Sequence, residues 1–562
     1  MQRRLIPRPA SPGDPDMIDR RRFIGTSVAG GAAAALGTAA CAPDAPQGAG
    51  VEGGASAAGG VPPFELDEAT VADLQAAMAS GERTARSITQ LYLDRIEALD
   101  GRGPELRSVI ETNPEALDIA DQLDAERQAS GPRGPLHGIP VALKDNIDTH
   151  DRMTTTAGSL ALEGSIPRQD SFIAERLRKA GAIILAKLNM SEWAYFRGER
   201  ATSGWSARGG QCRNPYALDR NPCGSSSGSG TAGSANLSAL TIGTETGGSI
   251  MCPSSINGIV GIKPTVGLWS RSGVIPISHS QDTAGPMCRT VRDAAVLLGP
   301  VTGVDPRDPA TAASAGNSHA DYSRFLDAGG LQGARIGVAR SFGGFTPEEM
   351  ALFEDAVQAM REAGAEIVDP ANLPDAAWND EQPLLVLEYE FKANLNAYLA
   401  SLGPDAPVKT LAEVIEFNER NADVEMPHFG QQRLIASEAR GPLTDQVYLD
   451  AVRTIQRGNR EDGIDALMDE HNLDAIAAPT MGVAWKTDHI IGDRLTGGSS
   501  AGPAAIAGYP DISVPMGFVS ELPVGVSFFG RRWSEPTLIR IAYAFEQATG
   551  HRRPPTFAET LG

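Results

Sequence analysis

The chain has 562 residues, of which 41% are hydrophobic and 21% are charged. This composition is typical of a globular protein with a large core, and it excludes a chain that is disordered throughout. The formal net charge of -21 argues against a nucleic-acid partner, because binding phosphates requires a basic surface. After residue 60 the sequence has no apolar run of about 18 residues, so we expect no membrane-spanning helix there.

An arginine cluster near the N-terminus comes before an uncharged stretch that is rich in Gly and Ala. The cluster is Arg20-Arg21-Arg22, and the stretch covers residues 24–40. This order predicts a twin-arginine export signal over residues 1–40 and a periplasmic location, with a basic tail as the alternative. Residues 36–41 resemble a lipobox in which Cys41 would be acylated, whereas Ala40-Cys41-Ala42 also fits an ordinary cleavage site. A membrane-tethered lipoprotein and a free periplasmic protein both remain open.

The stretch that follows the predicted signal is mostly Gly, Ala and Pro and has no periodicity. It predicts a flexible linker over residues 41–63, followed by a folded domain over residues 64–562. The cysteines of that domain have neither CxxC nor Cys/His spacing for zinc; they are Cys212, Cys223, Cys252 and Cys288. We expect buried free thiols, and a Cys212–Cys223 disulfide is the alternative in an oxidising compartment.

The apolar pattern of the domain alternates between helical and strand-like segments. Helical spacing over residues 66–99 predicts two helices, with Thr84 capping the second, and Asn113-Pro114 predicts the start of a third. Short apolar runs predict buried strands at 139–143, 183–186, 240–243, 259–262, 335–339, 474–478, 511–515 and 524–529. Further helices are predicted at 171–180, 347–363, 447–471 and 535–549. The alternation predicts an α/β fold: a single large domain with a central mixed, mostly parallel β-sheet covered by helices on both faces.

Two residues near the ends of predicted strands have the chemistry of acyl transfer. Ser249 follows Gly247-Gly248 just beyond the strand at 240–243, where the backbone amides of a sharp turn can form an oxyanion hole. Lys144 ends the apolar run at 139–143, which would desolvate its ammonium group, lower its pKa and make it a base. Each residue alone also fits a structural role, as a helix-capping serine in a glycine-rich turn and as a salt-bridged lysine at a strand end.

Other patterns in the sequence do not support a different chemistry. Residues 224–228 match G-x-S-x-G and residues 228–233 match G-x-G-x-x-G, but neither motif has a strand directly before it. This stretch is better interpreted as the start of a small-residue helix over 229–239. The histidines are scattered, so a Ser-His-Asp triad cannot be assembled.

Three stretches in combination resemble the amidase signature family: LHGIPVALKDNI (136–147), NPCGSSSGS (221–229) and TETGGSI (244–250) leading into NGIVGIKPTVG (257–267). The similarity extends over residues 66–550. It implies the amidase signature fold and a Ser-cisSer-Lys triad with Lys144 as base, Ser225 as the cis-peptide serine and Ser249 as nucleophile. It also implies that Ser226 helps to position Lys144, and that the amides of Thr246, Gly247, Gly248 and Ser249 hold the oxyanion.

The implied activity is hydrolysis of carboxylic or peptide amides to an acid and ammonia or an amine through an acyl-enzyme, without metal or cofactor. Further stretches resemble the peptide amidase branch of the family, although Gly247 stands where that branch is expected to carry Asp. A fatty-amide or aryl-amide hydrolase and a non-catalytic ligand-binding relative are the alternatives. The expected partner is a small-molecule or peptide amide substrate, and the sequence leaves a monomer and a homodimer open.

Overall fold

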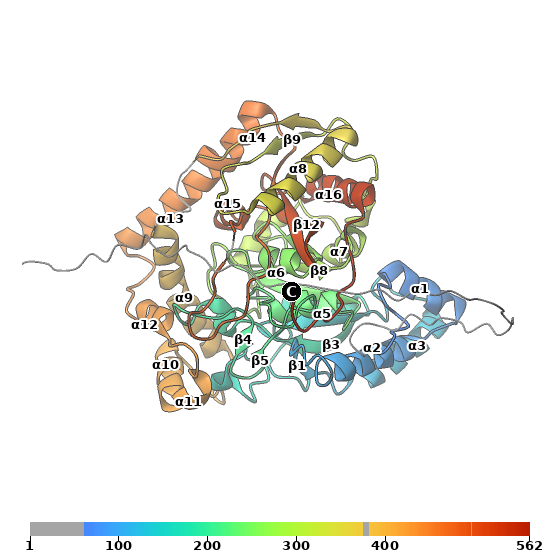
Figure 1. The fold of residues 1–562 in the computed structure, drawn as a ribbon. Helices are drawn as coiled ribbons and strands as arrows, with labels where there is room; N and C mark the ends of the chain where they lie inside the picture. The colour runs from blue at the N-terminus through green and yellow to red at the C-terminus, as the bar shows by residue number, and fades with distance from the viewer. Residues whose placement is uncertain (1–60, 375–380, 496, 562) are drawn as a thin grey trace, which may run out of the picture. The chain divides into compact units, whose positions relative to one another are not determined.

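This computed structural model describes residues 61–374, 381–495 and 497–561 (Figure 1), which belong to one compact unit. The predicted export signal over residues 1–40, with Cys41, lies outside the described residues, and so do residues 41–60 of the predicted linker. None of the described helices is long and apolar enough to span a membrane.

A mixed β-sheet forms the centre of the described part of the chain. Within that part the sheet has 11 strands in the order β1-β3-β2-β6-β8-β7-β12-β13-β11-β9-β10, and it includes all the strands predicted from the sequence. Its strands are β1 (Val109–Thr112), β2 (Pro140–Lys144), β3 (Ile183–Leu188), β6 (Leu240–Glu245), β7 (Val260–Lys263), β8 (Thr283–Cys288), β9 (Arg335–Val338), β10 (Glu366–Val368), β11 (Ala475–Pro479), β12 (Asp511–Val519) and β13 (Leu522–Phe529). A separate small ribbon pairs β4 (Trp205–Ser206) with β5 (Gly210–Gln211).

The sheet is mixed, as expected, but the prediction that it is mostly parallel is wrong. The parallel pairs are β2 with β3, β2 with β6, β9 with β11, and β9 with β10. The remaining neighbours in the described sheet are antiparallel. Two features cause the difference: β8, which the sequence pattern did not predict, lies between β6 and β7 and runs against both, and β12 and β13 form a hairpin.

Helices surround the sheet, and the predicted cap of the second helix, Thr84, is confirmed. Thr84 caps α2 through a reciprocal capping box with Ser87, and Thr346 does the same for α8 with Glu349. The described α-helices are α1 (Val71–Ser80), α2 (Ala85–Leu99), α3 (Ala116–Ser130), α4 (Phe172–Lys179), α5 (Ser227–Ser234), α6 (Met251–Ile256), α7 (Val291–Leu298), α8 (Pro347–Glu362), α9 (Gln382–Ser401), α10 (Leu411–Arg420), α11 (Ala422–Glu425), α12 (Gln432–Glu438), α13 (Gln446–Asn459), α14 (Ala466–His471), α15 (Ala501–Ala507) and α16 (Glu535–Thr549).

Three helix predictions need correction in their bounds. The helix expected to start at Asn113-Pro114 begins at Ala116, because the Asn113 side chain accepts the backbone N–H of Glu115 and closes a turn first. The segment predicted as one helix over 447–471 is divided by a π-helical turn, Arg460–Asp465, between α13 and α14. The small-residue helix expected over 229–239 is α5, which begins two residues earlier and ends at Ser234.

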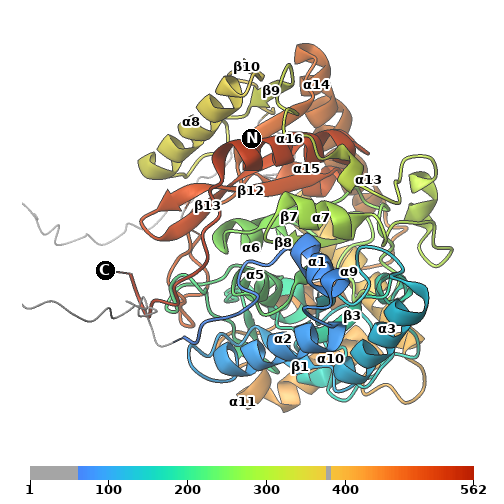
Figure 2. The same ribbon diagram turned by 90° about the vertical axis from the view of Figure 1, so that its right-hand side faces the viewer.

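The helices gather in groups around the sheet. Figure 1 shows α1, α2 and α3 on one side, and α9, α10, α12 and α13, which pack on one another, on the other side. Figure 2, turned by 90°, places the first group in front. Helices α5 and α6 pack together on the central strands, where β2 and β6 are parallel neighbours. The carboxyl ends of β2 and β6 therefore meet at one edge of the sheet, beside α5 and α6.

Candidate active site

Lys144 ends strand β2 and is completely buried. Its Nζ lies within hydrogen-bond distance of Ser225 Oγ at 2.7 Å, of Thr244 Oγ1 at 2.8 Å and of the Thr244 carbonyl at 3.1 Å. Burial lowers the pKa of Lys144 well below its ordinary value, and the carboxylates of Asp282 and Glu245 oppose this shift without cancelling it. The expectation of a desolvated lysine at the end of this strand is confirmed.

Ser225 lies in the loop before α5, and its hydroxyl is the partner that Lys144 reaches from β2. The Gly224–Ser225 peptide bond is cis, and the Ser225 carbonyl accepts the backbone N–H of Ser191 at 3.1 Å. The side chain is 1% exposed. The structure therefore brings Lys144 and Ser225 into direct contact although 81 residues separate them in sequence.

Ser226, the N-cap residue of α5, contacts Thr244 in β6. Its Oγ donates to the Thr244 carbonyl at 2.9 Å and accepts the Thr244 N–H at 3.1 Å. The expected support of Lys144 by Ser226 thus runs through Thr244, whose carbonyl and hydroxyl both accept from Lys144. Sequence reasoning assigned no role to Thr244, although it lies inside the quoted TETGGSI stretch, because only the packing of β2 against β6 brings it to the lysine.

The turn from Thr246 to Ser249 leads from β6 into the short helix α6. Gly248 has a left-handed backbone with φ +83, and its carbonyl accepts the N–H of Cys252 at 2.8 Å. Within the described part of the chain, the N–H groups of Gly247, Gly248 and Ser249 have no hydrogen-bond partner. These amides are therefore free to bind an oxygen atom that carries negative charge.

Two buried acids that sequence reasoning missed hold this turn. Glu245 Oε2 accepts the N–H groups of Ile250 and Met251 at 2.7 and 3.0 Å, so these amides are already used. Asp282 accepts the Thr246 hydroxyl at 2.6 Å, and burial raises the pKa of Asp282 to about 6. The role of Asp282 was not found from the sequence, because Asp282 lies directly before strand β8, which the apolar pattern did not predict.

Ser249 is half-buried and lines a cavity of about 450 Å³ together with Gly224, Gly247 and Gly248. The backbone N–H of Ser226 donates to the Ser249 carbonyl at 3.3 Å. This bond places the candidate nucleophile beside the loop before α5 that contains the cis Gly224–Ser225 peptide, called the cis-serine loop below. Most of the remaining wall is apolar and includes Leu387 and Ile506. The cavity is thus large enough for a small substrate and opens onto Ser249.

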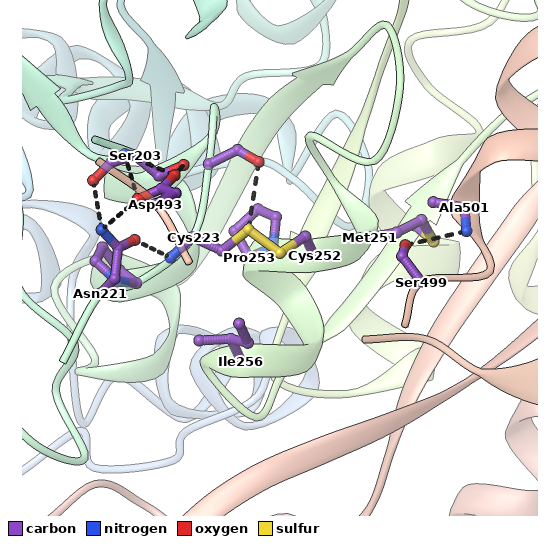
Figure 3. The surroundings of a disulfide bond; sticks show 12 residues. Ser203, Asn221, Cys223, Met251, Cys252, Pro253, Ile256, Asp493, Ser499 and Ala501 are labelled. Atoms are coloured by element: carbon purple, nitrogen blue, oxygen red, sulfur yellow. Dashed lines mark hydrogen bonds between the residues drawn. A yellow bond between two sulfur atoms is a disulfide. The ribbon is translucent and has the colours of Figure 1, made fainter. Parts of the chain in front are cut away.

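A disulfide between Cys223 and Cys252 forms part of the cavity wall (Figure 3). Its Cα atoms are 6.1 Å apart, and it joins the loop before Ser225 to the helix after Ser249. The expectation of buried free thiols is confirmed for Cys212 and Cys288 but is wrong for Cys223 and Cys252. The alternative Cys212–Cys223 pairing is also wrong, since the Cys212 thiol donates to Thr231 Oγ1. Sequence spacing could not find the partner, because the packing of α6 against the cis-serine loop sets it.

No group of three or more His, Cys, Asp or Glu side chains within the described ranges is placed to hold a metal ion. The site places the buried amine of Lys144 against the Ser225 hydroxyl, and it places free backbone amides and Ser249 at the wall of the neighbouring cavity.

The amidase family model matches residues 87–539 of the chain, which therefore belongs to the amidase signature family and is an amide-hydrolysing enzyme. A peptide amidase solved in complex with the competitive inhibitor chymostatin is 51% identical, with a TM-score of 0.84, and the alignment covers 88% of this chain and 100% of that one. The native peptide amidase of Stenotrophomonas maltophilia is 50% identical, with the same TM-score, over 88% of this chain and 99% of that one. A probable amidase of Arabidopsis thaliana is 42% identical over 88% of this chain and 92% of its own length.

Proposed function

We propose that Ser249 is the nucleophile, Ser225 the proton relay and Lys144 the general base of this amidase. The observation that carries the proposal is the 2.7 Å contact between the buried Nζ of Lys144 and Ser225 Oγ. The loop that contains Ser225 is also hydrogen-bonded to the Ser249 carbonyl through Ser226 N. A neutral amine fits these contacts, because two N–H groups can donate to the Thr244 oxygens while the lone pair accepts the Ser225 hydroxyl.

In this mechanism Ser249 Oγ attacks the amide carbonyl while its proton passes to Ser225 Oγ, whose own proton passes to Lys144 Nζ. The amides of the turn from Thr246 to Ser249 bind the oxyanion that forms. The relay then returns the proton to the leaving nitrogen, so that ammonia or an amine departs and an acyl-enzyme remains. Water, deprotonated through the same relay, releases the acid and restores Ser249.

The roles are tested by replacing each member and a matched buried lysine. Lys144→Met, Ser225→Ala and Ser249→Ala should each lower kcat/KM for amide hydrolysis by at least ~10³-fold, since a nucleophile and its base act as one unit. Lys187 is equally buried on the neighbouring strand β3 and donates to Ile147 O and Thr155 Oγ1, so Lys187→Met is the control. Folded Lys144→Met or Ser249→Ala protein that hydrolyses amides at the normal rate would remove the assignment.

We propose peptide amides as the substrate class, with ammonia as the released product. Support comes from the similarity to peptide amidases and from the apolar cavity beside Ser249. Ammonia release from peptide amides, long-chain fatty amides and aryl amides separates this proposal from the alternative hydrolases. Chymostatin, a competitive inhibitor of the related peptide amidase, should compete with the peptide amides here. Faster turnover of fatty or aryl amides would overturn the choice, and no turnover of any class would favour the ligand-binding relative.

We also propose export by the twin-arginine route to the periplasm, where a lipoprotein acylated at Cys41 and a free periplasmic protein are the two alternatives. The Cys223–Cys252 disulfide supports an oxidising compartment. Replacing Arg21 and Arg22 by Lys should retain the chain in the cytoplasm, and Cys41→Ala should release it from the membrane fraction if Cys41 is acylated. Unchanged export of the double Lys variant would contradict the proposed signal.

A further inference from the structure

Asp493 is the single acidic or basic side chain among the described residues that line the cavity of Ser249. Four neutral groups hold its carboxylate. Ser203 donates through its backbone N–H at 3.0 Å and through its hydroxyl at 2.6 Å, Trp485 Nε1 donates at 3.1 Å and Asn221 Nδ2 at 3.4 Å. Figure 3 shows Asp493, Ser203 and Asn221 beside Cys223 of the disulfide. The carboxylate is therefore fixed in position next to the cis-serine loop.

The charge of this carboxylate has no cationic partner within the described part of the chain. No Lys, Arg or His lies within ion-pair distance of it, and its donors are all uncharged. Burial raises the pKa of Asp493, and the hydrogen bonds from Ser203 and Trp485 oppose that shift. Asp493 is partly buried, and carboxylates that are removed from water in proteins are normally paired with a cation. At a cavity wall, the missing partner can be a group of the bound ligand.

We infer that Asp493 selects amides that carry a positive charge, with its carboxylate binding the ammonium or guanidinium group of a basic residue in the substrate. The inference rests on the proposed function, because it takes the cavity of Ser249 as the substrate site. The apolar wall of Leu387, Met481 and Ile506 then contacts the aliphatic part of the same side chain. Asp493 is thus a specificity-determining residue for the hydrolysis that Ser249 performs.

The test compares a charged and an uncharged side chain of nearly the same shape. The probes are acetyl-dipeptide amides with lysine or norleucine at the last or the preceding position, with phenylalanine at the other. Wild-type protein should show a kcat/KM about tenfold higher for lysine than for norleucine at one of these positions, and salt should reduce this preference. Asp493→Asn keeps the shape and an acceptor oxygen, and it should bring the ratio to about one. Asp405 is exposed and outside the cavity, so Asp405→Asn should keep the wild-type ratio.

Each outcome decides the inference. Equal turnover of lysine and norleucine amides by wild-type protein overturns it, whatever the variants do. Equal losses for both amides in Asp493→Asn also overturn it, since they would mean that Asp493 only anchors its loop. Calorimetric binding of the same amides to Ser249→Ala protein separates this test from the proposed function. Wild-type protein could hydrolyse none of these amides while Ser249→Ala protein binds the lysine amide about tenfold more tightly than the norleucine amide. If adding Asp493→Asn to Ser249→Ala then removes that difference in affinity, the charge site stands and the peptide-amidase proposal fails.

Discussion

Thr244 is the residue that connects the buried lysine to the rest of the site. Its hydroxyl accepts from Lys144 Nζ and from Asn146 Nδ2. Its backbone N–H donates to Ser226 Oγ, and its carbonyl accepts from the same hydroxyl. The position of Lys144 is therefore set by an oxygen atom on the neighbouring strand as well as by Ser225. Without this acceptor, the buried amine would lose one of its three partners.

Thr244→Val should lower kcat/KM by roughly 10- to 100-fold, because an unpaired buried donor costs about 1–3 kcal/mol and frees Lys144 to leave its position. Thr241→Val is the matched control in the same strand. Thr241 is equally buried, and its hydroxyl donates to Met287 O at 2.6 Å, away from Lys144. This control should lose comparable stability in thermal melting while keeping kcat/KM. Equal activity losses in the two variants would mean that Thr244 acts only through stability.

At the scale of elements, the site depends on holding the cis-serine loop against helix α6. Two links do this: the hydrogen bond from Ser226 N to Ser249 O and the Cys223–Cys252 disulfide, which closes a sequence separation of 29 residues. Cys223 precedes Ser225 in the sequence and Cys252 follows Ser249, so the disulfide closes a loop that contains both serines. Its loss should loosen the relative placement of relay and nucleophile.

Removing the disulfide by Cys223→Ala with Cys252→Ala should lower the free energy of unfolding by about 2–4 kcal/mol, the usual effect of closing a loop of this length. The double variant should also hydrolyse amides more slowly than wild-type protein. A dithiol reductant should reproduce both effects in wild-type protein and leave the double variant unchanged, as measured by denaturant unfolding and ammonia release. Cys288→Ala, which removes a buried free thiol, controls for the loss of a core side chain. A wild-type protein that keeps its stability and activity after complete reduction would contradict this role.

The strands that the sequence failed to predict show where the pattern loses information. Strand β8 is buried along its whole length, but it contains Gly285 and Pro286, which are depleted in central strands. Gly285 is required there because a Cβ atom would lie 2.0 Å from Ile262 O of the neighbouring strand. Strand β8 is therefore held by the close approach of its backbone to strand β7, and at this position it lacks the apolar side chain by which a buried strand is recognised in the sequence. The insertion of β8, and with it the excess of antiparallel over parallel pairs in the described sheet, was therefore not predictable from the local sequence pattern.

For the whole molecule, the sequence predicted the parts of the site that lie in continuous motifs. Lys144 and Ser249 could be singled out from their positions after predicted strands, whereas Ser225 was named only through the resemblance to the amidase signature family. Thr244, Asp282 and Asp493 could not be assigned, because their roles arise from contacts between segments that are distant in sequence. The disulfide partner was missed for the same reason. Glu245 was also missed, although it holds the amides of Ile250 and Met251 within its own turn.

In the proposed mechanism, a buried and uncharged Lys144 activates Ser249 through Ser225. The most direct test is the rate at which an alkyl fluorophosphonate labels Ser249, located by mass spectrometry and measured across pH. The neutral amine accepts the proton, and burial lowers the pKa of Lys144 below its ordinary 10.5, so the rate should rise with pH through that lowered value. We predict labelling at Ser249 with this inflection, and at least ~10³-fold slower labelling in Lys144→Met. Labelling of another residue, or an unchanged rate and pH profile in folded Lys144→Met protein, would contradict the account.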